Sequence, residues 1–189
     1  TAAKPDEMRR ALTGFRLLDT GEKHGTLTAM VHGAPIEITT FRADGAYTDH
    51  RRPDGVSFVT SLREDLARRD FTVNAMAADA AGAVTDLFGG QDDLRRGVIR
   101  CVGDPAERFA EDALRMLRAL RFAARLSFRI DGATAAAIHA ARSGLRAVAP
   151  ERLHKELGGI LCGRQAAALL EEFSDVLFEL IPELAPCQG

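Results

Sequence analysis

Residues 104–126 read DPAERFAEDALRMLRALRFAARL, and this stretch decides how the second half of the chain folds. It opens with Asp104 and Pro105, followed by an acid at Glu107, which is the pattern of an N-cap, a first-turn proline and a capping-box carboxylate. At about 100° per residue its apolar positions share one stripe, so we predict a single helix that runs to about Leu126. The stripe consists of Phe109, Ala113, Leu117, Leu120 and Ala124.

The segments after this stretch are helical in pattern, whereas those before it mix strands and helices. We expect later helices at 133–142, 150–161 and 164–180. Earlier, we expect helices at 5–12 and 61–69 and strands at 26–31, 36–41, 71–78 and 84–87, with a turn at Gly89-Gly90. The fold class is therefore α+β, with a domain boundary near Gly103 that divides residues 1–103 from residues 104–189.

The composition excludes several classes of protein. The chain has 189 residues, 46% of them hydrophobic and 28% charged, with a formal net charge of −2. A chain of this length and hydrophobic content can bury a core. No apolar run approaches the roughly 20 residues of a membrane span, so we expect no membrane partner. The three cysteines and five histidines are scattered. They predict neither a disulfide framework nor a zinc site, and they favour a cytoplasmic location.

The positive charge is unevenly distributed and consists almost entirely of arginine. Arginine supplies 22 of the 25 basic residues, and between Arg95 and Arg129 nine arginines stand against four acids. The planar guanidinium fork suits phosphates and base edges. This local excess therefore favours an anionic ligand more than the net charge of the chain does.

The strongest candidate site lies on the predicted long helix. Glu111, Asp112 and Arg115 would fall within about 100° of arc, away from the apolar stripe, and Arg118 and Arg121 would extend this polar side. A carboxylate beside an arginine can match a nucleobase edge while further arginines hold phosphates. The same spacing is also typical of an ordinary i, i+4 ion pair on a solvated face. Spacing alone leaves both interpretations open.

Three weaker candidates lie earlier in the chain. Arg68-Arg69-Asp70-Phe71 could hold a triphosphate or could be a solvated helix end, and residues 86–90 (DLFGG) could be a ligand-binding turn or a turn only. Glu37 is a carboxylate within an otherwise apolar and threonine-rich strand. In a cleft it could help to bind a divalent cation, whereas in solvent it would carry no function.

Six segments, taken in order, resemble the bacterial class II tRNA nucleotidyltransferase and poly(A) polymerase family over nearly the whole chain. The resemblance implies a polymerase-beta-like nucleotidyltransferase head, here without its N-terminal part, followed by an all-helical neck. The segments are DTGEKHGT at 19–26, EITTFR at 37–42, RRDFTVNA at 68–75, DLFGG at 86–90, RFAEDALRMLRALRF at 108–122 and PERLHKEL at 150–157.

The resemblance also implies roles for individual residues. Asp112 and Arg115 would act as an amino-acid template for CTP and ATP, and Arg69 would contact the nucleotide or its triphosphate. Arg118 and Arg121 would lie beside the nucleotide, and the motif around Arg152 would buttress the neck. The supporting residues of these motifs would be Arg68, Asp70, Asn74 and Glu111.

The first motif of the family, a Gly-Gly turn followed by Asp-x-Asp, is absent from the sequence. It supplies the metal-binding carboxylates in the family, and we expect it immediately upstream of Thr1. The implied cofactor is Mg²⁺, for which this chain would provide no ligand set and at most Glu37 as an auxiliary carboxylate. The parent protein would be an enzyme, whereas residues 1–189 alone would be inactive.

The expected reaction is the transfer of CMP and AMP from CTP and ATP to the 3′ end of tRNA. Residues 20–25 resemble the CCA-adding branch, and the loop at 44–53, expected to be exposed and mobile, resembles that of enzymes able to add the terminal A. A poly(A) polymerase or A-adding enzyme is the alternative within the family. A non-catalytic module that binds nucleotide or RNA is the alternative from another class. The sequence leaves a homodimer open.

Overall fold

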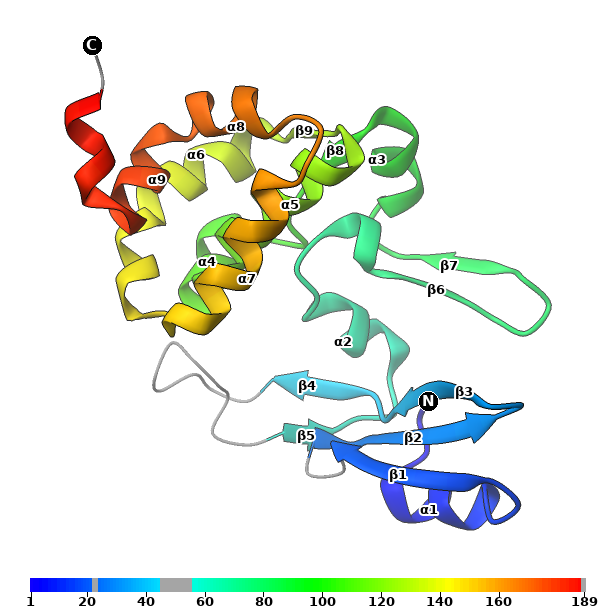
Figure 1. Ribbon diagram of the computed structural model, residues 1–189. Coiled ribbons are helices and arrows are strands. Elements are labelled where there is room, and N and C mark those ends of the chain that lie inside the picture. Colours follow the sequence, from blue (N-terminus) through cyan, green and yellow to red (C-terminus); the bar gives the residue numbers. More distant parts are fainter. Residues whose placement is uncertain (22–23, 45–55, 188–189) are drawn as a thin grey trace. The chain divides into compact units, whose positions relative to one another are not determined.

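A computed structural model describes residues 1–21, 24–44 and 56–187 of the chain (Figure 1). The described residues form two compact units, the first ending at Arg68 and the second beginning at Arg69. Both strands and helices are present, so the α+β class is confirmed. Residues 45–53 of the predicted loop and residues 22 and 23 of the segment at 20–25 lie outside the described residues, whereas Asp44 is the last residue of a strand. The domain boundary near Gly103 stays a prediction.

The first unit contains a three-stranded antiparallel sheet of order β1-β2-β3. The predicted hairpin is confirmed, because β2 (Thr26–Val31) pairs with β3 (Ala34–Thr39). The two residues between them, His32 and Gly33, have φ values of 49° and 83°, as a twist-matched two-residue turn requires. Strand β1 (Arg16–Gly21) was not predicted, since its polar ends and short apolar centre show no alternation.

The other elements of the first unit are short, and both predicted helices are confirmed. The helices are α1 (Pro5–Ala11) and α2 (Leu62–Ala67), and the two remaining strands are β4 (Arg42–Asp44) and β5 (Val56–Phe58), which pair antiparallel. Ser61 accepts a hydrogen bond from the Glu64 amide at 3.4 Å, so the predicted N-cap forms. The helix ends two residues before the predicted Arg69.

The second unit begins with a segment that the sequence analysis assigned wrongly. The predicted strand at 71–78 is instead the short 3-10 helix η2 (Thr72–Asn74) followed by β6 (Met76–Ala78), which pairs with β7 (Val84–Asp86). The Thr72 hydroxyl donates to Asp93 at 2.7 Å. That acid lies on α3 (Gly90–Arg96), a helix that was not predicted. A Cβ on Gly90 would collide with the Thr72 carbonyl oxygen, so glycine permits this close packing.

The predicted single helix at 104–126 is two helices, α4 (Pro105–Glu111) and α5 (Leu114–Leu126). Between them Asp112 is extended, with φ −147° and ψ 102°, and its carboxylate accepts a hydrogen bond from the Leu114 amide at 3.1 Å. An acid that caps the following turn competes with continuation of the helix. The predicted apolar stripe is nevertheless confirmed, because all five of its members are buried.

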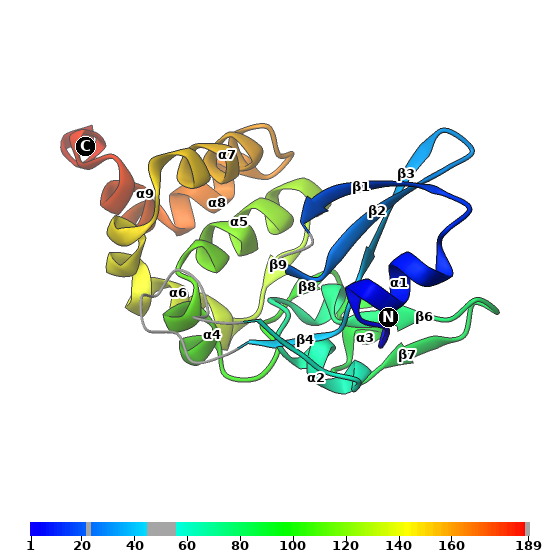
Figure 2. The same ribbon diagram turned by 90° about the horizontal axis from the view of Figure 1, so that it is seen from below.

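The rest of the second unit is mostly helical and packs around α5 (Figures 1 and 2). One short parallel pair joins β8 (Val98–Ile99) to β9 (Arg129–Ile130), so the region after residue 104 is not helical throughout. The predicted helix at 164–180 is broken at Phe173 into two. The remaining elements are α6 (Gly132–Ala141), η3 (Arg142–Ala147), α7 (Pro150–Leu161), α8 (Ala166–Glu172), α9 (Ser174–Leu180) and η4 (Pro182–Cys187).

Candidate functional site

The break between α4 and α5 places the Asp112 carboxylate between backbone and side-chain donors. One oxygen, Oδ1, accepts the Leu114 amide at 3.1 Å, and the other, Oδ2, accepts Nη2 of Arg152 on α7 at 2.8 Å. The Asp112 side chain is 22% exposed. It is therefore held at both oxygens and still reaches solvent.

Glu111 joins two arginines across the same break. Its Oε2 accepts Nη1 of Arg115 at 2.5 Å, and its Oε1 pairs with Arg108. Arg115 also donates to the carbonyl oxygen of Arg108 at 3.3 Å. The i, i+4 ion pair therefore forms, but the side chains of Arg115 and Glu111 are only 11% and 20% exposed. The predicted common arc on one helix is wrong, because the partners belong to α4 and α5.

A second charged cluster links the segment after Arg69 to the middle of α5. Arg118 donates to Oδ2 of Asp70 through Nε at 2.8 Å and through Nη2 at 2.5 Å. Oδ1 of the same carboxylate accepts the Phe71 amide at 2.9 Å and the Asn74 side-chain amide at 3.1 Å. Because Asp70 is buried, these charge-assisted bonds are stronger than they would be in water.

Arg69 and Arg121 differ in how much solvent they meet. Arg69 is exposed and donates to the Asn74 carbonyl oxygen at 3.1 Å. Arg121 is 16% exposed, pairs through Nε with Glu156 on α7, and lies over the Phe122 ring at 4.3 Å. A Cβ on Gly159 would lie 2.5 Å from Cδ of Arg121, so α7 has no side chain where the arginine passes. Glu156 was not predicted as the partner of Arg121, because it lies 35 residues away in the sequence.

The two remaining candidates, Arg68 and Glu37, lie in the first unit. Arg68 pairs with Oδ1 of Asp65 at 3.0 Å. Glu37 is exposed on β3, where its Cα is paired with that of Thr28. Within residues 1–21, 24–44 and 56–187, no three His, Cys, Asp or Glu side chains form a group that could hold a metal ion. The described residues therefore do not fit a metal centre of their own.

The predicted turn at residues 86–90 is confirmed, and Asp86 explains it. Its carboxylate accepts the amides of Gln91 at 2.8 Å, Gly90 at 2.9 Å and Phe88 at 3.3 Å. These backbone hydrogen bonds, chiefly that of Gln91, lower the pKa of the Asp86 carboxyl. The contacts of Asp86 described here are those of a helix cap for α3.

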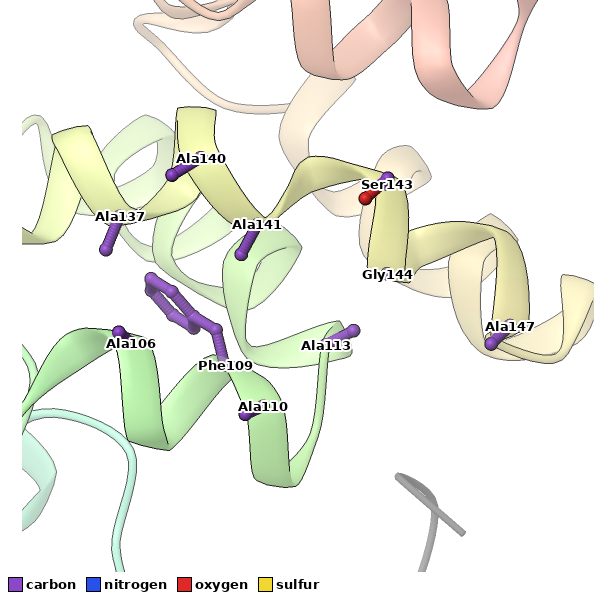
Figure 3. A pocket seen from close by; sticks show the side chains of 10 residues that line it. All are labelled: Ala106, Phe109, Ala110, Ala113, Ala137, Ala140, Ala141, Ser143, Gly144 and Ala147. Carbon is purple, nitrogen blue, oxygen red and sulfur yellow. The ribbon is translucent and has the colours of Figure 1, made fainter.

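A pocket of about 380 Å³ lies beside the Asp112 break, between α4, α6 and η3 (Figure 3). Its walls are mostly alanine, and the Phe109 ring projects into it from α4. This pocket was not predicted, because alanines at helical spacing are typical of ordinary helix contacts. Its only hydroxyl comes from Ser143. The lining offers little for a charged ligand.

Two further observations concern the described part of the chain. None of its helices is both long enough and apolar enough to cross a membrane. Cys101 and Cys162 are free thiols, the first buried and the second exposed. Desolvation raises the pKa of the Cys101 thiol to about 12, so this group is neutral at physiological pH.

The chain belongs to the bacterial class II tRNA nucleotidyltransferase and poly(A) polymerase family. Residues 1–100 match the family described as the poly A polymerase head domain. Residues 127–187 match the one described as a probable RNA and SrmB-binding site of polymerase A. The resemblance inferred from the sequence motifs is thereby confirmed.

Individual relatives are CCA-adding enzymes. The chain is 46% identical over 186 residues to the CCA-adding enzyme of Ligilactobacillus salivarius. The aligned region covers 98% of this chain and 46% of the relative. It is 50% identical over 164 residues to that of Limosilactobacillus fermentum, covering 87% of this chain and 40% of the relative. The chain thus spans less than half the length of these curated relatives.

Solved structures agree with this assignment. The Bacillus stearothermophilus CCA-adding enzyme in complex with CTP is 39% identical, with a TM-score of 0.82 over 92% of this chain and 41% of that one. The Thermotoga maritima CCA-adding enzyme complexed with tRNA is 30% identical, with a TM-score of 0.73 over 94% of this chain and 40% of that one. The partial nucleotidyltransferase head followed by a helical neck therefore describes this fold.

Proposed function

We propose that the protein carrying this chain transfers CMP and AMP from CTP and ATP to the 3′ end of tRNA. The observation that carries the proposal is the 46% identity to a CCA-adding enzyme across 98% of the chain. The solved relatives bound to CTP and to tRNA support the same substrates. The cysteine distribution supports a cytoplasmic location.

Asp112 and Arg115 are proposed to select the base. Cytosine and adenine each present an exocyclic amino donor beside a ring-nitrogen acceptor, and a carboxylate and a guanidinium match that pair of groups. Both side chains are held at the α4–α5 break. Asp112 is hydrogen-bonded to the Leu114 amide and to Arg152, and Arg115 is paired with Glu111. Because these contacts fix the two groups before a base arrives, less ordering entropy is lost when it binds.

Two further arginines, Arg118 and Arg69, are proposed to lie beside the ribose and the phosphates. Arg118 is the better supported, since its side chain is 34% exposed while Asp70 holds one edge of its guanidinium. Arg69 is exposed beside Asn74. Arg121 is mostly enclosed by its pair with Glu156, which supports a role in orienting α5 against α7.

Mg²⁺ is proposed as the cofactor of the transfer, because nucleotidyl transfer generally uses metal ions to stabilise the charge that develops on the phosphate oxygens. Glu37 is an exposed single carboxylate. We therefore expect the metal ligands in an Asp-x-Asp motif outside residues 1–189. The residues described here bind and orient the nucleotide.

The direct test incubates the full-length protein with a tRNA that lacks its CCA end, with each nucleotide in turn and with CTP and ATP together. We expect two CMP additions with CTP, completion of CCA when ATP is also present, and no extension with UTP or GTP. Long adenylate tails from ATP alone would favour the poly(A) polymerase alternative. The descriptions of both matched families name this activity. Nucleotide and RNA binding without extension would favour the non-catalytic module.

A further inference from the structure

Most arginines of the basic stretch are already neutralised by acids within the fold. Of the nine between Arg95 and Arg129, six form ion pairs, and three exposed residues remain. Among the described residues no acid pairs with these three, which are Arg96, Arg125 and Arg129. The six paired arginines are Arg95, Arg100, Arg108, Arg115, Arg118 and Arg121.

The fold gathers these three arginines where α5 ends. The Arg129 amide donates to the carbonyl oxygen of Gly97 at 2.9 Å, which places Arg129 beside the residue that follows Arg96. Phe128 lies against the same glycine, since a Cβ on Gly97 would be 3.4 Å from Cδ1 of the ring. Arg125 lies in the last turn of α5, four residues before Arg129, so the backbone segments that carry the three arginines are neighbours.

A fourth exposed arginine, Arg164, comes from the connection between α7 and α8. The next residue, Gln165, donates its amide to the carbonyl oxygen of Ala124 at 3.4 Å. The preceding one, Gly163, packs so closely that a Cβ there would be 2.7 Å from the Ala124 carbonyl carbon. Figures 1 and 2 both show this connection beside the end of α5.

The acids nearest in sequence to Arg96 and Arg129 pair with other arginines. Asp92 pairs with Arg95, while Asp93 and Asp131 both pair with Arg100. Cations near helix C-termini are favourable, which accounts for Arg96 and Arg125 being tolerated there but not for four arginines that converge from separate segments. Unpaired positive charge on neighbouring segments favours the binding of an anionic partner.

We propose that Arg96, Arg125, Arg129 and Arg164, named here the α5-end patch, bind the sugar-phosphate backbone of the RNA substrate. This inference rests on the proposed function and adds a second RNA-facing surface to it. At 1.5 Å per residue, α5 carries this patch about 18 Å from the Asp112 break. Arg129 and Arg164 lie within residues 127–187, the segment that matches the family described as a probable RNA-binding site, and guanidinium forks suit phosphates.

The test uses the full-length protein and a tRNA that lacks its CCA end. The variant Arg125→Gln/Arg129→Gln/Arg164→Gln removes one patch charge from each of three segments. We expect tRNA affinity to fall roughly tenfold, and the slope of log K against log salt concentration to decrease in magnitude by about 2 to 3, because fewer counterions are released. At saturating tRNA, kcat and the KM for CTP should stay unchanged.

The matched control is Arg10→Gln/Arg16→Gln/Arg63→Gln, which removes the same charge from three exposed arginines of the first unit. We expect its affinity to change less than twofold. Equal affinities and salt slopes for the patch variant and the wild type would overturn the proposal, as would an equal loss in the control. Loss of binding to another protein, with tRNA affinity unchanged, would also overturn it.

The test is independent of whether the protein extends tRNA. If the wild type binds tRNA but adds no nucleotide, and the patch variant still binds more weakly, the α5-end patch stands while the proposed function fails. If the wild type extends tRNA and the patch variant does so with an unchanged KM for tRNA, the proposed function stands while the patch fails.

Discussion

The two ends of α5 carry the same kind of residue in opposite electrostatic situations. Near its start, Arg115 and Arg118 are 11% and 34% exposed and are matched to Glu111 and Asp70. At its far end, Arg125 is exposed and has no acid partner among the described residues. Paired, enclosed arginines have fixed positions and can discriminate between ligands. Unpaired, exposed arginines can contact phosphates and add affinity without selectivity for the base.

The largest expected effect comes from breaking an enclosed ion pair of α5. Glu156→Ala should lower the free energy of unfolding by about 3–5 kcal/mol, because Arg121 would keep a buried charge without its partner. Arg125→Ala at the far end should change it by less than about 0.5 kcal/mol. Urea unfolding of both variants measures the contrast. Similar losses in the two would show that the enclosed and the exposed arginines of α5 do not differ in this way.

The next effect concerns base selection by the fixed groups. Arg115→Ala and Asp112→Ala should each reduce discrimination between CTP and UTP by roughly 1–3 kcal/mol, because a hydrogen-bonding group of the base loses its partner. The measurement is kcat/KM for the four nucleotides in the full-length protein. Arg125→Ala serves as the control and should leave the ratio unchanged. Unaltered selectivity in both site variants would show that the Glu111–Arg115 pair has a structural role only.

A smaller effect tests how α7 makes room for the enclosed arginine. Gly159→Ala should destabilise the protein by about 1–3 kcal/mol, since its Cβ would meet Arg121 and force a shift. The neighbouring Gly158 faces open space. Gly158→Ala should therefore stabilise the helix by up to about 1 kcal/mol. Thermal unfolding measures the stability change in each variant. Changes of the same sign in both variants would contradict the prediction.

The smallest effect is chemical. The pKa of the Cys101 thiol is raised to about 12 by burial, so the reactive thiolate is scarce at pH 8 even though Arg108 and Arg115 favour it. In a Cys162→Ala/Cys187→Ala variant, we expect a thiol reagent to label Cys101 only on unfolding. Cys101→Ala, in which exposed Cys162 remains, is the control and should be labelled in the folded state. Rapid labelling of Cys101 in the folded protein would show that the core around α5 opens readily.

Local signals in the sequence predicted the local parts of the fold well. The N-caps at Ser61 and Asp104 form as expected, because each depends on residues within one turn. The apolar stripe of the long stretch is also right, although the helix is broken at Asp112. Periodicity cannot reveal a break this short, since buried residues on both sides still face the same core.

The partners of the candidate site could not be predicted, because they are distant in sequence. Asp70 and Arg118 are 48 residues apart, and Asp112 and Arg152 are 40 apart. Both pairs form only after helices pack. Packing also depends on glycines such as Gly159, whose role cannot be predicted from the hydrophobic pattern of the sequence. The resemblance to a family named candidate residues, and their roles stay predictions. It did not show which of them the fold encloses.

The double anchoring of Asp112 has a consequence for how the protein would handle successive nucleotides. A carboxylate offers about four lone-pair positions, and the Leu114 amide and Arg152 occupy two of them. An incoming amino group can therefore be accepted at a remaining position while both anchors stay in place. Recognition would then displace water alone, with little reorganisation of the protein. The same carboxylate would be ready for the next base without being reset.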